Sequence, residues 1–103
     1  MTSVSNLLLV VSEPSRQEIL RLIWNTERSA GDIAGKFETT FGAVSQHLHV
    51  LRDAGLVELR KQGRMRYYRA RRENFGPLAR YLEGIWAMHL DKLKELAETE
   101  EGR

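Results

Sequence analysis

Apolar residues recur with helical spacing through the first half of the chain. Positions three and four residues apart share one face of a helix, so this spacing predicts amphipathic helices with one face in the core. Val44, Leu48 and Leu51, for example, follow one another at i, i+4 and i+7. The pattern predicts four helices, over residues 3–11, 12–26, 30–37 and 40–54.

Polar residues at the predicted helix ends support these boundaries. Ser12 is the expected N-cap of the second helix, and Ser29 and Asp32 have the S-x-x-D spacing of a capping box before the third. Thr40 can cap the fourth helix, and Gly55 stands where a glycine often ends one. The third and fourth helices are therefore two short helices joined by a tight turn.

After the fourth predicted helix, the pattern of apolar residues changes from the spacing of a helix to that of strands. Residues 57–61 and 65–70 form two short runs joined by residues 62–64, in which Gly63 is free to adopt a positive φ. Such a pattern is typical of a β-hairpin.

A long final helix is predicted from residue 74 to residue 98, with Pro77 in its first turn. Its apolar stripe is wider than a small domain can cover by itself. We therefore expect a homodimer built on the first and last helices. The residues expected at this interface are Leu7, Leu8, Leu82, Ile85, Trp86, His89 and Leu93.

Two short helices followed by a hairpin are the parts of a winged helix-turn-helix. The predicted fold is mainly α with a small β-hairpin, with about five helices and a two-stranded wing. The 103 residues suffice for a single domain. Within this domain, the dimerisation helices, the helix-turn-helix and the wing are expected at residues 1–11 and 74–98, 29–54, and 57–70, respectively.

Composition narrows the class of protein. Hydrophobic residues make up 42% and charged residues 29%, as in ordinary globular proteins. The absence of cysteine excludes disulfides, thiolate zinc sites and cysteine nucleophiles, and it fits a reducing compartment. The longest apolar run, residues 7–11, is far shorter than the roughly 20 residues of a membrane span. We therefore expect a cytoplasmic protein without membrane contact or cofactor. We also expect no catalytic site, because the Ser, His and acidic residues are scattered over helices assigned to other roles.

Charge is concentrated in one segment. Residues 57–72 contain seven basic residues and one acidic residue, a net charge of +6, which leaves −4 for the rest of a chain whose total is +2. A basic patch on an acidic body is typical of a protein that binds nucleic acid.

The helix-turn-helix and the wing predict double-stranded DNA as the partner. A recognition helix needs small or polar residues on its outer face, because bulky ones would hold its backbone away from the bases. Gln46 suits a bidentate contact with adenine. The residues expected to contact DNA are Thr40, Gly42, Ala43, Ser45, Gln46 and His49 on the fourth helix, and Arg60, Lys61, Arg64 and Arg66 on the wing.

Three segments together resemble one family. Residues 41–57, FGAVSQHLHVLRDAGLV, are similar to the recognition-helix signature of ArsR-type bacterial repressors, and residues 60–68 and 13–20 match the same family in the same order. The resemblance covers about residues 7–98. It implies a homodimer that binds a palindromic operator and blocks transcription until an effector releases it.

The sequence departs from metal-sensing members of that family. Residues 30–36 contain no thiolate ligand, and the last helix carries His89 and Asp91 without a second histidine one or two turns on. A closed zinc site needs three or four ligands. We therefore expect no metal, interpret His89 as a packed or interface residue, and leave the effector unidentified.

Several interpretations stay open at this point. The domain could be a protein-interaction winged helix whose basic wing meets an acidic partner. His47 is interpreted as packing more than base contact, and His49 as either. Trp24 and Trp86 are interpreted as packing residues. Phe41 is either buried against the third helix or in contact with a thymine methyl group.

Overall fold

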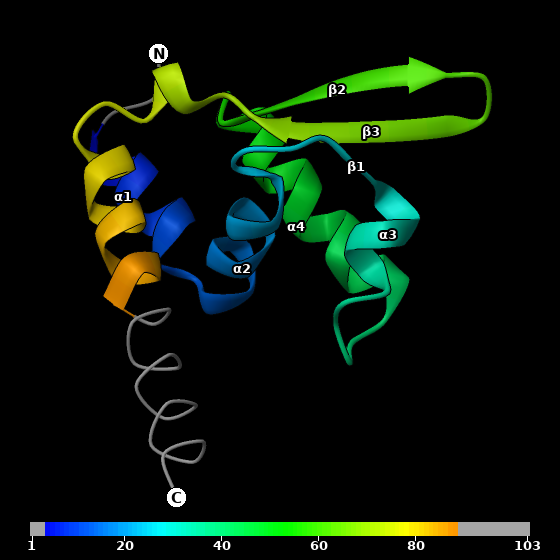
Figure 1. Ribbon diagram of the computed structural model, residues 1–103, viewed down its shortest axis with the longest axis horizontal. Helices are drawn as coiled ribbons and strands as arrows, with labels where there is room; N and C mark the ends of the chain where they lie inside the picture. The colour runs from blue at the N-terminus through cyan, green and yellow to red at the C-terminus, as the bar shows by residue number, and fades with distance from the viewer. Residues whose placement is uncertain (1–3, 89–103) are drawn as a thin grey trace, which may run out of the picture.

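The computed structural model describes residues 4–88 and shows the predicted architecture (Figure 1). Its elements are α1 (Val4–Ser12), α2 (Pro14–Ile23), β1 (Arg28–Ser29), α3 (Ala30–Ala34), α4 (Phe41–Asp53), β2 (Val57–Gln62), β3 (Met65–Ala70) and the 3-10 turn η1 (Arg72–Asn74). Residues 78–88, drawn from yellow to orange, form the last helix described. The mainly helical fold with a β-hairpin is confirmed.

The hairpin extends away from the rest of the domain. Strands β2 and β3 pair in antiparallel register from Val57↔Ala70 to Gln62↔Met65, and Gly63 turns the chain with a φ of 60°. In Figure 1 the tip of this hairpin lies at the opposite end of the molecule from α1 and the last helix. We call residues 57–70 the wing.

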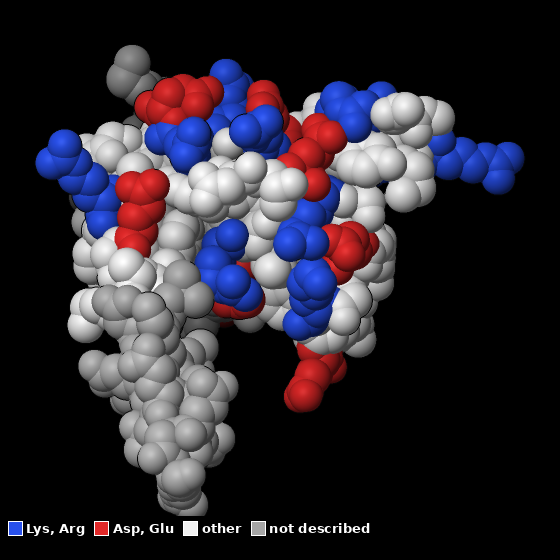
Figure 2. All heavy atoms as spheres, viewed as in Figure 1, with Lys and Arg blue, Asp and Glu red and all other residues white. Residues whose placement is uncertain are grey.

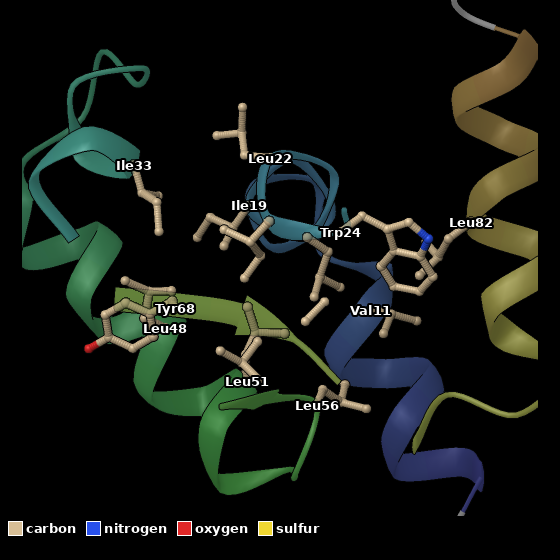
Figure 3. Close-up of a cluster of buried hydrophobic side chains, with 14 of the residues drawn as sticks. Val11, Ile19, Leu22, Trp24, Ile33, Leu48, Leu51, Leu56, Tyr68 and Leu82 are labelled. Atoms are coloured by element: carbon tan, nitrogen blue, oxygen red, sulfur yellow. The ribbon is translucent and has the colours of Figure 1, made fainter. Parts of the chain in front are cut away.

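The core forms where α1, α2, α4, the sheet and the last helix meet (Figure 3). Each fully buried aliphatic side chain contributes roughly 1.5–3 kcal/mol relative to an exposed one. The periodic apolar faces predicted for α2 and α4 are all inside. Residues with at most 2% of their surface exposed include Val11, Ile19, Leu20, Ile23, Ile33, Val44, Leu48, Leu51, Leu56, Phe75 and Leu82.

The caps agree with the sequence at three of four predicted positions. The Thr40 hydroxyl accepts a hydrogen bond from the backbone N–H of Ala43 at 3.1 Å, and the Ser29 hydroxyl accepts one from that of Asp32 at 3.1 Å. Gly55 follows α4 with a φ of 77°. The prediction for Ser12 is wrong, because Pro14 occupies the first position of α2 and the residue before it, Glu13, is the N-cap.

Two helices end earlier than the sequence predicted, because the apolar spacing continues beyond the last helical hydrogen bond. α2 ends at Ile23 rather than at residue 26, and α3 ends at Ala34 rather than at residue 37. Strand β1 was not predicted, because a two-residue strand has no period of its own. It pairs with β3, with Arg28 opposite Tyr68, and makes the sheet three-stranded in the order β1-β3-β2.

The last helix begins at residue 78, not at residue 74. Gly76 has a φ of 57°, which interrupts the helical backbone. Asn74 has a different role, since its side-chain amide donates a hydrogen bond to the carbonyl oxygen of Gly55 at 2.6 Å. The predicted continuation to residue 98, with His89, Asp91 and Leu93, lies outside the described residues.

The terminal helices expose apolar surface, although not at every predicted position. Leu82 is fully buried within the domain, so the prediction that it lies at a dimer interface is wrong. Leu7, Ile85 and Trp86 are half-buried, and Trp86 packs edge-on against Trp24 with ring centroids 5.1 Å apart. Both tryptophans are thus packing residues, as the sequence indicated.

An open apolar groove of about 800 Å³ lies between α1 and the last helix. We call it the terminal-helix groove. Three leucines dominate its apolar lining, and Tyr81 at its edge is 58% exposed. Its apolar lining residues are Leu8, Leu9, Val11, Pro77, Leu78 and Tyr81.

Among residues 4–88, no helix has the length and apolar character that a bilayer crossing requires.

Candidate nucleic-acid interface

The outward face of α4 is polar because its opposite face is in the core. Val44, Leu48 and Leu51 are buried, so the helical period turns Gln46 and its neighbours to solvent. Of the residues predicted to contact DNA on this helix, Ala43 is half-buried. The others, Thr40, Gly42, Ser45, Gln46 and His49, are exposed.

The first turn of α4 is open to a close approach. A Cβ added at Gly42 would meet no atom nearer than the Thr40 hydroxyl oxygen at 3.9 Å, so nothing inside the domain requires glycine there. Glycine in a helix costs roughly 0.5–1 kcal/mol relative to alanine. The packing of the domain therefore does not explain the glycine at this exposed position.

The two histidines of α4 face different environments. His49 is on the outer side, with its Nε2 3.2 Å from the Asp53 carboxylate. His47 is half-buried and faces α2, with its Nδ1 3.4 Å from Arg16 Nη1 and 3.8 Å from Glu13 Oε2. The structure thus supports the packing interpretation of His47.

Glu13 and Arg16 connect three helices, which sequence reasoning did not foresee. Arg16 Nε donates to the carbonyl oxygen of Val10 in α1 at 2.7 Å, and the Glu13 carboxylate accepts from the backbone N–H of Arg16 at 2.9 Å. Burial opposes ionisation of Glu13, but the N–H donors of Arg16 and Ser15 and the neighbouring positive charges hold its pKa below the ordinary value. We call Glu13, Arg16 and His47 the polar junction.

Three of the four wing cations predicted to contact DNA are exposed to solvent and have no ion-pair partner among residues 4–88. Lys61, Arg64 and Arg66 are exposed, and within residues 4–88 no carboxylate lies within ion-pair distance of them. Figure 2 shows basic side chains along the hairpin, one of which projects past its end. Such unpaired guanidinium and ammonium groups are available to phosphate oxygens.

Arg60, also predicted to contact DNA, is exposed but pairs with other side chains of the domain. Its Nη2 and Nε lie 2.7 and 3.0 Å from the two carboxylate oxygens of Glu27, and its guanidinium lies 4.7 Å from the ring centroid of Tyr67. The hydrogen bonds from Arg60 lower the pKa of Glu27. Arg60 therefore joins strand β2 of the wing to the loop before β1.

The partner of Arg60 was out of reach of sequence reasoning, because Glu27 is 33 residues away in the chain. Arg28, in contrast, has partners that are near in the chain: its Nε donates to the carbonyl oxygen of Leu22 at 3.0 Å, and its Nη1 donates to Asp32 at 2.7 Å. Arg28 thereby joins the end of α2 to the start of α3.

Comparison with known proteins adds independent evidence. A family model described as "Bacterial regulatory protein, arsR family" matches residues 13–58, from the N-cap of α2 into β2. The transcriptional repressor SdpR of Bacillus subtilis is 32% identical over 65 residues, which cover 63% of this chain and 72% of that protein. The transcriptional activator HlyU of Vibrio cholerae is 36% identical over 62 residues, covering 60% of this chain and 57% of that one.

Solved structures agree in fold over most of the chain. The crystal structure of a possible transcriptional regulator for arsenical resistance is similar with a TM-score of 0.66 at 38% identity, covering 85% of this chain and 92% of that chain. The structural similarity therefore extends well beyond residues 13–58, the segment that the family model matches.

Proposed function

We propose that this protein, a member of the ArsR family of bacterial regulatory proteins, acts as a repressor that binds a palindromic operator as a homodimer. The family and the relatives are transcription regulators, not enzymes. The observation that carries the proposal is the exposed polar face of α4 beside the unpaired cations of the wing.

The dimensions of α4 suit the major groove, which admits one helix. Gln46 supplies a donor and an acceptor for the N7 and N6 positions of adenine, and Ser45 and Thr40 supply hydroxyls for bases or phosphates. Gly42 and Ala43 let the helix N-terminus come close to the DNA. Lys61, Arg64 and Arg66 neutralise phosphates beside the groove, whereas Arg60 acts by holding the wing in place.

The apolar terminal-helix groove supports the homodimer. Leu8, Leu9 and Tyr81 are 47%, 69% and 58% exposed, and a stable association needs apolar surface of this kind at its centre. We retain Leu7, Leu8, Ile85 and Trp86 as interface residues. Two α4 helices related by a two-fold axis would enter successive major grooves about 34 Å apart, which requires a palindromic site.

In this proposal the compact dimer represses transcription by blocking access to the promoter. The protein acts in the bacterial cytoplasm, where its DNA target lies. A signal that released the dimer would act without thiolate ligands, because the chain has no cysteine.

Binding to DNA tests the proposal directly. Operator sequences are selected from a random duplex pool with the full chain, and binding is then measured by fluorescence anisotropy against a scrambled duplex. We expect a preference of at least about 1,000-fold. Gln46→Ala should relax the preference at one base pair per half-site, costing about 1–3 kcal/mol there. Equal binding to operator and scrambled DNA would instead favour a domain whose basic wing binds an acidic protein.

A further inference from the structure

Two large apolar side chains are exposed far from the terminal helices. Phe41, the first residue of α4, is 58% exposed, and Met65, the first residue of β3, is 47% exposed. Both line one open cavity of about 330 Å³, together with residues 29–31, Arg64 and Arg66. We call this cavity the Phe41 notch.

The core does not account for Phe41. One of the two interpretations that the sequence left open was burial against the third helix, and the exposure of the ring excludes it. Helix propensity does not explain the residue either, because phenylalanine is a weaker helix former than the polar residues common at such positions. Phe41 is not a single exposed ring, because Met65 lies with it on the same cavity, and an apolar patch rimmed by polar residues is typical of a binding site.

The surroundings of the notch restrict what can occupy it. Arg64 and Arg66 line the same cavity as the two apolar side chains, and neither has an ion-pair partner among the described residues. The occupant therefore needs an apolar group next to an anionic one. In the major groove, thymine alone presents an apolar group, its C5-methyl, and the phosphates of its own strand lie at the rim of the groove.

The position of the notch also suits DNA. Phe41 precedes Gly42 at the N-terminus of α4, the end of a recognition helix that contacts base edges. Ser45, one turn further along, lines the adjoining small cavity with Phe41 and Arg66. The aromatic ring thus stands between the base-reading face of α4 and the phosphate-binding side of the wing.

We propose that the Phe41 notch is a specificity determinant that selects a thymine at one position of each operator half-site, through contact of the Phe41 ring with the thymine C5-methyl. This inference rests on the proposed function, since it needs a specific operator. Met65 closes the far side of the notch, and Arg64 and Arg66 bind the phosphates beside it.

Replacement of thymine by deoxyuridine tests the contact, because it removes only the methyl group. Each symmetric pair of thymines in the selected operator is replaced in turn, and binding of the full chain and of Phe41→Ala is measured. Burial of one methyl contributes about 0.8 kcal/mol, so the wild-type chain should bind about fourfold more weakly per half-site at one position, or about 15-fold for the pair. Phe41→Ala should bind both operators equally, and Phe41→Leu should restore part of the difference.

The outcomes separate the two proposals. Specific operator binding with no position sensitive to deoxyuridine, or a sensitivity that persists in Phe41→Ala, overturns the role of the notch and leaves the repressor intact. Failure of the wild-type chain to prefer any selected duplex overturns the proposed function, and the notch proposal with it. Circular dichroism checks that Phe41→Ala is folded, as the exposure of the side chain leads us to expect.

Discussion

The two ends of this domain expose different chemistry. At one end, α4 and the wing present small and polar side chains together with the unpaired cations Lys61, Arg64 and Arg66. At the other, α1 and the last helix present leucine, tyrosine and methionine, with Leu9 and Met88 about 70% exposed. Neither surface is explained by the core, which lies between them. The difference fits the two partners proposed above, DNA at the first end and a second copy of the chain at the other.

The largest expected effect comes from breaking the apolar end. Leu8→Glu places a charge in the terminal-helix groove, which should prevent dimerisation because burying an unpaired carboxylate is costly. A monomer can occupy only one half-site, so operator affinity should fall at least about 100-fold, since paired sites reinforce each other by about 10²-fold or more. Light scattering gives the mass and anisotropy gives the affinity.

Leu8→Met keeps the groove apolar and is the matched control, which should remain a dimer. If Leu8→Glu stays dimeric and binds normally, the terminal helices do not form the interface, and the contrast between the two ends loses its meaning.

A smaller effect is expected at the cationic end. Arg64→Ala should weaken binding by about tenfold on every sequence alike, because the arginine binds phosphate and not a base. The slope of log K against log salt should decrease by about 0.9 for each phosphate that is no longer neutralised, or about 1.8 for the dimer. Anisotropy titrations at several salt concentrations measure this slope. An unchanged slope would remove Arg64 from the DNA interface.

The polar junction between the two ends should affect stability more than binding. Glu13→Ala removes the N-cap of α2 and should lower the free energy of unfolding by about 1 kcal/mol at pH 7. The pKa of Glu13 is lowered in the folded state, so its contribution is present above the ordinary value of about 4.3 and is lost as the pH falls through the lowered value.

Urea unfolding at pH 7 and at pH values below 4 therefore checks the junction. The difference between the wild-type chain and Glu13→Ala should shrink as the pH falls. A difference that stays constant with pH would mean that the Glu13 charge does not stabilise the junction.

The smallest effect distinguishes the two roles considered for Arg60. If Arg60 holds the wing, Glu27→Ala should weaken operator binding by about threefold, the order expected of an exposed ion pair. If Arg60 contacts phosphate instead, Glu27→Ala should strengthen binding, because it removes a competing anion. The sign of the change in anisotropy decides between them, with Glu58→Ala, an exposed acid of the same wing, as control.

Much of this site could be predicted because its signals are local. The period of Val44, Leu48 and Leu51 set the outward face of α4, and the caps Ser29 and Thr40 set where α3 and α4 begin. Strand β1 and the end of α3 were missed, since a two-residue strand and a five-residue helix depend on neighbours that the period does not encode. The same reason explains why Leu82 was placed at the interface wrongly and why the role of Arg60 was predicted incompletely. Each contacts residues that are distant in the chain.

The amino-acid sequence by itself determined the order of the main helices and the two hairpin strands, the polar and apolar faces of each helix and the concentration of charge in the wing. These depend on residues close together in the chain. Only the tertiary structure decided which exposed groups remain available. It buried Leu82, paired Arg60 with Glu27, and left Phe41 open beside Arg66. Availability depends on contacts between distant segments, and such contacts form only when the chain folds.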